Sequence, residues 1–568
     1  MKSARFIAFL VLLLLITVPV SATQVNVTWN ASQPSPQLAW TTIDGLTNVT
    51  PPDFNNTAPW KNIGRVNKSD QVMVYYPKFW YYTTYDAAHN WFIYSISDVN
   101  VTSPQYGVHP SFISDGHELN AFYLGAYEGA VQYANGTYNT GDFAGVNTAA
   151  VTGDMLASYP GLKPASGQNN SITLPLFRTL VQNRNKGASY NQSQGWQLQT
   201  FQQVSLVELL YITEYANWDS QVVIGAGVTN LASGTGNEAV NTGSTSTLGN
   251  ATGNSAVLHS SGVWTYPVNI RGVENFYGNV WKWVDGLNIQ ANNKPWIADH
   301  GFASDTFASP YIYTGLVLPN AGGYQRNLSY TVLADWVFLP SSASGGSTST
   351  YIPDYYYQAT GNRGALLGGR WSGGAIAGLF CWSLANVASV VNQTVGARLS
   401  YIPVPVAASF TANSTGGYAP VAVQFTNISS GDHSSYLWDF GDSTTSTSAT
   451  PVHTYTTSGN YSVSLTITGD GGTNRSAQVT YVNVTGPLAQ FTPAGPLSVR
   501  YPQGIYFRDQ STGSPTAWDW NWGDGTHCYT QNCYKVWYGP GVYRVNLTVN
   551  STLSDYSSNQ TVVNVLRW

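Results

Sequence analysis

An internal repeat near the end of the chain constrains the fold more than any other feature. The stretch SYLWDFGDSTTSTSATPVHTYTTSGNYSVSLTIT at 435–468 matches AWDWNWGDGTHCYTQNCYKVWYGPGVYRVNLTV at 517–549 without a gap, at an offset of 82 residues. The matched positions include Trp438 with Trp520, Asp442 with Asp524, and Tyr461 with Tyr543. Both copies alternate apolar and polar residues between Gly, Pro, Asn and Ser turns, a pattern typical of half-buried strands. The repeat predicts two all-β domains of about 80 residues, at 404–486 and 487–568.

The motifs inside the repeat resemble those of the PKD family. The first copy has Trp438-Asp439-Phe440-Gly441-Asp442, followed by His453-Thr454-Tyr455 and Gly459-x-Tyr461. The second copy departs from the family pattern at Asn521, Trp522 and Val536-Trp537-Tyr538. The resemblance implies immunoglobulin-like sandwiches of extracellular proteins, with a role in spacing and cell-surface interaction. We expect the Asp residues to bind turn amides rather than a metal ion.

The first 22 residues have the pattern of a secretory signal peptide. Lys2 and Arg5 precede an apolar run from Phe6 to Val20, and Val20-Ser21-Ala22 forms a small-residue cleavage site. We expect cleavage after Ala22 and a secreted, extracellular location at the cell surface; an uncleaved membrane anchor is the alternative. About twenty Asn-x-Ser/Thr sequons are consistent with a glycoprotein.

Composition narrows the class of partner. Charged residues are only 9% of the chain and the net charge is -5, so there is no basic field for nucleic acid. Cys528 and Cys533 are expected to pair in an oxidising compartment, whereas Cys381 is expected to be a small buried hydrophobe. No Cys/His cluster has zinc-site spacing, and we expect neither metal nor cofactor. A low charge, many sequons and tandem PKD motifs together resemble an archaeal cell-surface protein.

The segment 23–402 has a different sequence pattern from the repeated modules. The stretch QTFQQVSLVELLYITEYAN at 199–217 carries apolar residues at helical spacing and predicts a buried or amphipathic helix. Aromatic-rich strand patterns such as VMVYYPKFWYYTTYD surround it, and Gly/Ser/Thr/Asn-rich blocks at 232–263 and 341–350 predict exposed loops. The predicted architecture is an α+β domain with little helix and a β-rich N-terminal extension, followed by the two sandwiches.

Two motifs in this segment resemble the C-type-lectin-like fold in its formylglycine-generating-enzyme branch. They are GNVWKWVDG at 278–286 and the closing segment ALLGGRWSGGAIAGLFCWSLANVASVVNQTVGARLSY at 365–401. The order of the motifs is similar to that of ligand-binding domains in phage tail receptor-binding proteins and in the variable proteins of diversity-generating retroelements. The resemblance implies that the structural motif Gly278, Asn279, Trp281 and Trp283 places at least one Trp in the core.

The resemblance also implies a ligand-binding surface in the closing segment. In related proteins the contact residues lie between the Gly-Gly-x-Trp turn and the final strand. Carried to this chain, they are Trp371, Ser372, Ala375, Ile376, Phe380, Trp382, Ser383 and Asn386. Core packing is the alternative for Phe380 and Trp382. The chain departs from the family at Gly369-Arg370-Trp371, where Ser is usual, and at Gly396-Ala397-Arg398, where Phe is usual.

An enzymatic function is disfavoured. Formylglycine-generating enzymes use two cysteines in the closing segment, and this segment contains only Cys381. HELNA at 117–121 lacks the second histidine of a zinc-protease motif. The sequence therefore predicts no catalytic residues.

These features together predict an exported recognition or adhesion protein. Its C-type-lectin-like domain would bind an extracellular protein or glycan ligand, and its PKD domains would act as spacers. The alternatives are a structural envelope or sheath component, a virus-encoded host-attachment protein, and a secreted enzyme with PKD accessory modules.

Overall fold

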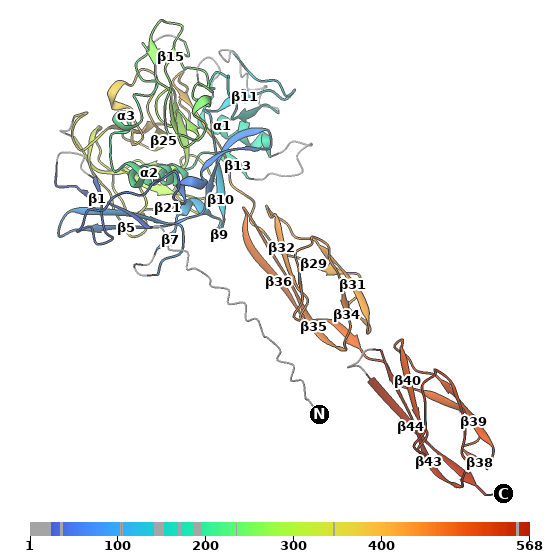
Figure 1. Ribbon diagram of the computed structural model, residues 1–568. Coiled ribbons are helices and arrows are strands. Elements are labelled where there is room, and N and C mark those ends of the chain that lie inside the picture. Colours follow the sequence, from blue (N-terminus) through green and yellow to red (C-terminus); the bar gives the residue numbers. More distant parts are fainter. Residues whose placement is uncertain are drawn as a thin grey trace, which may run out of the picture. The chain divides into compact units, whose positions relative to one another are not determined.

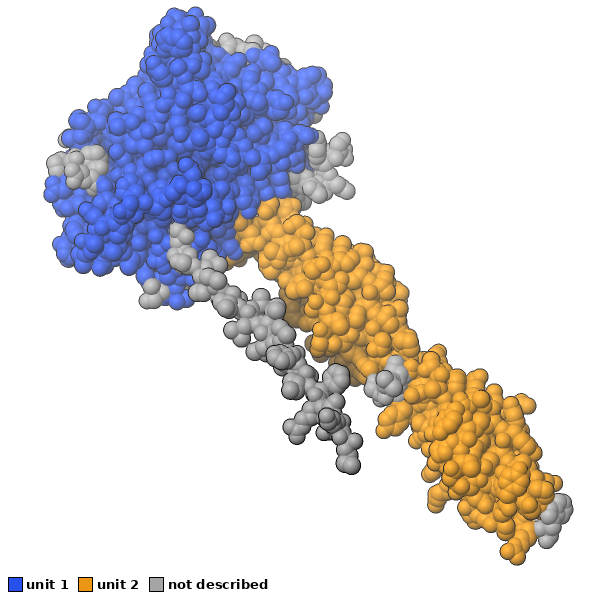
Figure 2. All heavy atoms as spheres, viewed as in Figure 1, with its two compact units in different colours: residues 1–115, 122–401 blue, residues 116–121, 402–568 orange. Residues whose placement is uncertain are grey.

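The computed structural model describes residues 24–567 except 34–37, 103, 105, 141–152, 168–171, 186–194, 234–235, 345–346 and 552–555. The predicted signal peptide therefore lies outside the described residues. The chain forms two compact units, coloured blue and orange in Figure 2: residues 1–115 with 122–401, and residues 116–121 with 402–568. Strands make up 44% and helices 8% of the residues, so the chain is mostly β. Within the described part, no helix combines the length and apolar character needed to cross a membrane.

The first unit is organised around a mixed sheet of nine strands. Its order is β21-β20-β19-β25-β26-β24-β22-β23, and β27 pairs in parallel with β19. The bounds are β19 Trp281–Gln290, β20 Lys294–Ile297, β21 Ile312–Tyr313, β22 Gly323–Leu328, β23 Pro340–Ala343, β24 Ile352–Gln358, β25 Arg363–Leu367, β26 Trp382–Asn386 and β27 Val395–Gly396. This sheet brings the GNVWKWVDG motif beside the closing segment, because β19 pairs with β25 and β25 with β26.

Two five-stranded sheets complete the frame of this unit. The first has the order β2-β1-β6-β5-β7 and the second has the order β13-β28-β10-β4-β3. The first consists of β1 Gln24–Asn30, β2 Leu38–Trp40, β5 Trp80–Asp86, β6 Trp91–Ser97 and β7 Gly107–Val108. The second consists of β3 Gly64–Lys68, β4 Gln71–Pro77, β10 Ala121–Gly125, β13 Trp196–Leu198 and β28 Leu399–Tyr401. The short ladders are β8 Ile113–Ser114 with β9 His117–Glu118, β11 Ala130–Gln132 with β12 Met155–Ala157, β14 Gly253–Asn254 with β17 Val268–Ile270 and β18 Val273–Glu274, and β15 Val257–Leu258 with β16 Trp264–Thr265.

The predicted helix is present as α2, Phe201–Tyr215, and it lies in the core. Thr200 and Gln203 form a capping box, in which each side chain accepts a hydrogen bond from the other residue's backbone N–H. Fourteen of its fifteen residues are buried, so apolar residues all round the helix meet protein on every side. Two further helices, α1 at Leu174–Arg184 and α3 at Ser220–Val223, were not predicted.

The second unit contains two sandwiches with the same strand order. The first consists of a three-stranded sheet, β29-β31-β34, and a five-stranded sheet, β30-β36-β35-β32-β33. The second consists of a three-stranded sheet, β37-β39-β42, and a five-stranded sheet, β38-β44-β43-β40-β41. The first comprises β29 Phe410–Ala412, β30 Gly416–Tyr418, β31 Val421–Asn427, β32 Ser435–Asp439, β33 Thr445–Ser446, β34 Val452–Tyr455, β35 Gly459–Gly469 and β36 Gly472–Thr485. The second comprises β37 Phe491–Ala494, β38 Ser498–Arg500, β39 Gly504–Asp509, β40 Ala517–Asn521, β41 His527–Cys528, β42 Cys533–Val536, β43 Gly541–Asn550 and β44 Tyr556–Leu566. The repeat in sequence is thus a repeat in structure.

Candidate functional site

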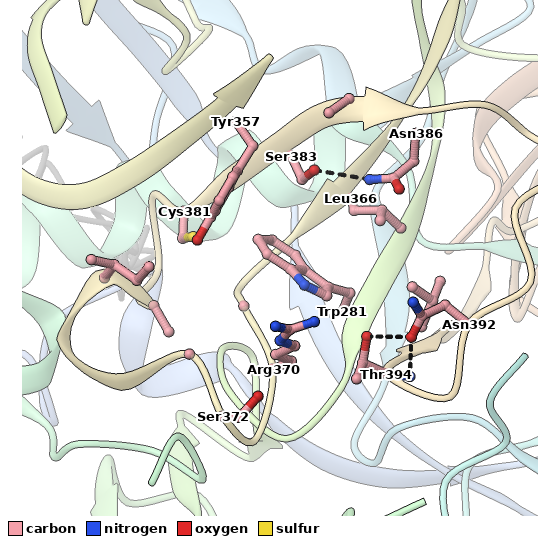
Figure 3. A pocket seen from close by; sticks show the side chains of 16 residues that line it. Trp281, Tyr357, Leu366, Arg370, Ser372, Cys381, Ser383, Asn386, Asn392 and Thr394 are labelled. Carbon is pink, nitrogen blue, oxygen red and sulfur yellow. Dashed lines mark hydrogen bonds between the residues drawn. The ribbon is translucent and has the colours of Figure 1, made fainter. Parts of the chain in front are cut away.

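A pocket of about 330 Å³ lies in the first unit, between the GNVWKWVDG motif and the closing segment. Its wall is built by β19, β24, β25 and β26, by the turn that leads into the 3-10 helix Gly374–Ile376, and by residues 392–395. Its volume is at the small end of the range of about 300–1,000 Å³ that is usual for ligand pockets. Figure 3 shows the side chains that line it.

Two aromatic side chains form the apolar part of the pocket. The rings of Trp281 on β19 and Tyr357 on β24 meet edge to face, with centroids 5.8 Å apart. Trp281 keeps 9% of its surface exposed, whereas Trp283, two residues along the same strand, has none exposed. The motif therefore has a double role, in which Trp283 belongs to the core and Trp281 contributes to the pocket.

Six polar side chains line the rest: Arg370, Ser372, Ser383, Asn386, Asn392 and Thr394. Several hold one another in place. Asn386 Nδ2 donates to Ser383 Oγ at 2.9 Å, and the Thr394 hydroxyl donates to Asn392 Oδ1 at 2.8 Å. Since a hydroxyl has one donor and two acceptor positions and an amide has four, these groups keep capacity for a ligand.

Cys381 also lines the pocket, but its thiol is unsuited to nucleophilic chemistry. It is 1% exposed, and burial together with the charge of Asp354 raises the pKa of the thiol well above its ordinary value. A thiol that stays protonated is a poor nucleophile and a poor metal ligand. Among the described residues, no group of three His, Cys, Asp or Glu side chains is placed to hold a metal ion. The pocket lining therefore includes two aromatic rings, neutral polar groups, one guanidinium and a protonated thiol.

The pocket includes four of the eight predicted contact residues: Ser372, Ile376, Ser383 and Asn386. Ala375 is exposed on the adjoining turn and does not line the pocket. These positions remain candidates for ligand contact.

Trp371, Phe380 and Trp382 were predicted as ligand contacts, but all three are fully buried and do not line the pocket. For Phe380 and Trp382 the structure agrees with the alternative of core packing. Trp371 packs in a cluster with Val280. The ring centroid of Phe380 lies 4.9 Å from that of Trp218. The ring centroid of Trp382 lies 5.6 Å from that of Phe201 of α2. Neighbouring side chains of an extended segment point to opposite faces. Because Cys381 and Ser383 face the pocket, Trp382 between them faces the helix.

Sequence reasoning missed several residues of the pocket. Tyr357 comes from a segment that carries no recognisable motif. Asn392 and Thr394 lie in the closing segment but were not among the contact residues carried over, and Trp281 was assigned to structure alone. Arg370 was noted only as a departure from the family pattern. That departure was a usable signal, because it places a cation where the family has a small neutral side chain.

A network of buried charges fixes the strand that carries Trp281. Lys282 is fully buried, and its Nζ lies 3.0 Å from Glu128 Oε1 and donates to the carbonyl oxygen of Gly278 at 2.7 Å. Burial lowers the pKa of Lys282 to about 8, although the Glu128 carboxylate opposes this effect. Asn279 also donates to Glu128, and its Oδ1 accepts from the backbone N–H of Val240. These bonds set the orientation of the strand below the pocket.

Gly278 and Asn279 have the backbone roles expected of a structural motif. Gly278 has a φ of +75°, and a Cβ atom there would lie 2.9 Å from the backbone N and O atoms of Val228. Asn279 has a φ of 61°, a left-handed conformation that Asn tolerates better than most residues. Other side chains would strain the turn that opens β19.

The repeated motif residues of the second unit have matching structural roles. Trp438 donates to the carbonyl oxygen of Ser448 at 2.9 Å, and Trp520 donates to that of Thr530 at 3.0 Å. Tyr461 and Tyr543 each donate to a backbone carbonyl four residues earlier, at 2.9 and 3.1 Å. Every one of these positions obeys the offset of 82 residues.

The aspartates of the repeat bind turn groups, as predicted. Asp442 accepts from the backbone N–H and hydroxyl of Thr444, and Asp524 accepts in the same way from Thr526. The predicted disulfide between Cys528 and Cys533 is present, and Cys381 is a free, buried cysteine.

Comparison with known proteins identifies the repeated modules. The PKD domain family matches residues 401–484 and 500–565. The pre-pro-metalloprotease PrtV of Vibrio cholerae is 44% identical over 64 residues, which are 11% of this chain and 7% of that protein. Collagenase ColQ1 of Bacillus cereus is 37% identical over 81 residues, which are 14% of this chain and 8% of that protein. The chain thus spans less than a tenth of the length of these relatives.

Solved structures match the same modules. The crystal structure of the PKD1 domain from Vibrio cholerae metalloprotease PrtV is 41% identical, with 14% of this chain and 96% of that domain covered and a TM-score of 0.12. The PKD1 domain of Vibrio anguillarum Epp is 36% identical, with 14% and 98% covered and a TM-score of 0.13. The family matches at residues 401–484 and 500–565 show that the chain carries two PKD domains.

Proposed function

We propose that this chain is an exported cell-surface recognition or adhesion protein. Its first unit would bind an extracellular protein or glycan through a C-type-lectin-like domain, and its PKD domains would hold that unit away from the surface. The observation that carries the proposal is the pocket of the closing segment, which combines two aromatic walls with six polar side chains. Four of the residues that the family resemblance implied for ligand contact lie in that pocket.

The construction of the pocket supports binding rather than catalysis. Its aromatic walls stand on strands of the central sheet, and two pairs of its polar groups, Asn386 with Ser383 and Thr394 with Asn392, are held by hydrogen bonds. A ligand would therefore meet a largely preformed surface and lose little binding energy to ordering side chains. Aromatic and small polar side chains supply this kind of contact in antibody loops.

The role of the PKD domains as spacers is supported by their self-contained cores. Each has its own cluster of buried apolar residues, centred on Trp438 in the first and on Trp520 in the second. In its relatives the module accompanies proteins named as a metalloprotease and a collagenase, so the module alone does not define an activity. The match to these proteins does not extend to a catalytic domain.

Filling the pocket tests the proposal. Ile376 is partly exposed at the pocket rim, and Ile376→Trp should block entry without disturbing the core. The purified chain would be screened on a glycan array and on extracts of cell surfaces. Leu258→Trp is the control, because Leu258 is 55% exposed and does not line the pocket.

The expected result is a set of specific hits that Ile376→Trp loses by at least about tenfold and Leu258→Trp keeps, a difference of about 1.4 kcal/mol. Equal binding by the Ile376→Trp chain and the unaltered chain would overturn the assignment of the pocket.

A further inference from the structure

Arg370 places an uncompensated positive charge in the pocket. No Asp or Glu side chain lines the pocket, and within the described ranges the Arg370 guanidinium has no ion-pair or hydrogen-bond partner. Burial raises the pKa of the neighbouring Tyr357, and the charge of Arg370 is among the influences that oppose this shift. A guanidinium has five N–H donors, so the pocket holds donors that no protein group uses.

Backbone hydrogen bonds hold the turn that carries Arg370 at the pocket. The carbonyl oxygen of Arg370 accepts from Gly373 N–H at 2.9 Å, and the N–H of Trp371 donates to the carbonyl oxygen of Asn279 at 2.8 Å. The buried ring of Trp371 anchors the next position in the chain. The backbone on the C-terminal side of Arg370 is therefore held in place, which keeps the base of this side chain at the pocket wall.

The surrounding groups fit a sugar ring better than a peptide. Trp281 and Tyr357 offer apolar ring surfaces, and Ser383, Asn386 and Thr394 offer neutral donors and acceptors on the pocket wall. A sugar ring has one less polar face, which matches the aromatic side chains. It also has several hydroxyl groups, which match the polar side chains. A carboxylate is one of the anions that a planar guanidinium binds with two parallel hydrogen bonds.

We propose that the pocket binds an acidic saccharide, in which Arg370 pairs with the carboxylate of a uronic acid residue while Trp281 and Tyr357 cover its ring. This inference rests on the proposed function of the pocket as the recognition site. The pocket volume of about 330 Å³ admits one sugar residue of a longer chain, and the polar groups distinguish it from an apolar cavity.

The test compares uronates with neutral analogues of the same shape. Oligomers of galacturonate, glucuronate and mannuronate and the methyl ester of each would be titrated into the full chain by calorimetry, beside a sulfated galactan oligomer. At least one uronate should bind about tenfold or more tightly than its ester, and added salt should weaken that binding. Tighter binding of the sulfated oligomer than of every uronate would overturn the carboxylate assignment.

Two arginine variants make the test specific. Arg370→Gln should remove the preference for the uronate and leave the melting temperature unchanged, because Arg370 is partly exposed and holds no protein partner. Arg326→Gln is the matched control, since Arg326 is exposed on β22 and does not line the pocket. The proposal is overturned if no uronate binds, if the esters bind equally, or if Arg370→Gln keeps the preference.

The two proposals fail in different ways. A neutral glycan or a protein that binds the unaltered chain and is lost on Ile376→Trp would refute the acidic saccharide and leave the recognition function standing. Binding that Ile376→Trp does not change would refute both.

Discussion

The first unit and the PKD modules treat charged side chains in opposite ways. The first unit buries Glu128, Glu274, Lys282, Asp354 and Arg398 at 0 or 1% exposure. Among the described residues of the two PKD modules, the buried polar side chains are those of Ser464 and Ser551, which carry no charge, and the ion pairs lie nearer the surface. Charged side chains therefore stabilise the interior of the first unit, whereas in the PKD modules they stabilise turns near the surface.

The difference follows from how each region satisfies its backbone. Strands β35, β36, β43 and β44 are 10 to 14 residues long, so most of their backbone groups bond within ladders. The first unit has many irregular segments, whose buried backbone groups need side-chain partners. Arg398 donates to the carbonyl oxygens of Gly125, Glu274 and Asn275. Glu274 accepts from the backbone N–H groups of Gly243 and Thr245.

The two PKD modules have the same turn aspartate but different residues paired with it. His453 lies 2.6 Å from Asp442 in the first module, and Lys535 lies 2.7 Å from Asp524 at the matching position of the second. The partner residue differs between the modules, while the aspartate and its turn bonds are the same. In a partly exposed pair the exact donor is of minor consequence.

The largest expected effect is one that both regions share. Trp382→Ala in the first unit and Trp438→Ala in the first PKD module each remove a fully buried indole, and each should cost about 3–5 kcal/mol of unfolding free energy. Calorimetry of the full chain should show a different transition shifted by each variant. A shift of Trp382→Ala equivalent to less than about 1 kcal/mol would return that residue to the ligand-contact surface.

Replacing a lysine in each region should lower the free energy of unfolding by different amounts. Lys282→Met leaves Glu128 buried without its cation and should cost about 3–5 kcal/mol, and adding Glu128→Gln should recover part of that loss. Lys535→Met breaks a partly exposed pair and should cost about 0–1 kcal/mol. Urea unfolding of the variants would measure both, and equal costs would contradict the comparison.

A pH dependence of stability between about pH 4 and pH 8 is expected from the first unit. Burial raises the pKa of Asp354 to about 8, so the folded state keeps a proton that the unfolded chain loses near pH 4. The contribution of Asp354 to stability is complete below pH 4 and falls as pH rises from about 4 to about 8. Asp354→Asn retains an acceptor for the Phe380 N–H and should remove this fall, by up to about 1.4 kcal/mol per pH unit.

The control for this prediction is the difference between the two pH profiles. His109 acts in the opposite sense, because burial lowers its pKa to about 3 and its stabilising effect is lost on acidification. Subtracting the profile of Asp354→Asn from that of the unaltered chain removes His109 from the comparison. Parallel melting profiles between pH 5 and pH 8 would show that Asp354 is ionised in the folded state.

Local signals allowed much of the fold to be predicted. The helix α2 was visible from its apolar spacing, and the PKD strands from their alternation and turn residues. Four of the predicted contact residues line the pocket, whereas Trp371, Phe380 and Trp382 are buried away from it. Ser383 and Trp382 are adjacent in sequence and point to opposite sides of β26, so only the position of α2 decides which of them is buried.

The sequence by itself determined the repeated modules, their turn aspartates and the pairing of Cys528 with Cys533, because those interactions join residues close in the chain or repeat at a constant offset. Only the tertiary structure decided the pocket and the buried charges. Trp281, Tyr357 and Arg370 come from distant segments, and Lys282 is paired with Glu128, which precedes it by more than a hundred residues. Such contacts depend on how the strands cross in space, which no short-range pattern of residues records.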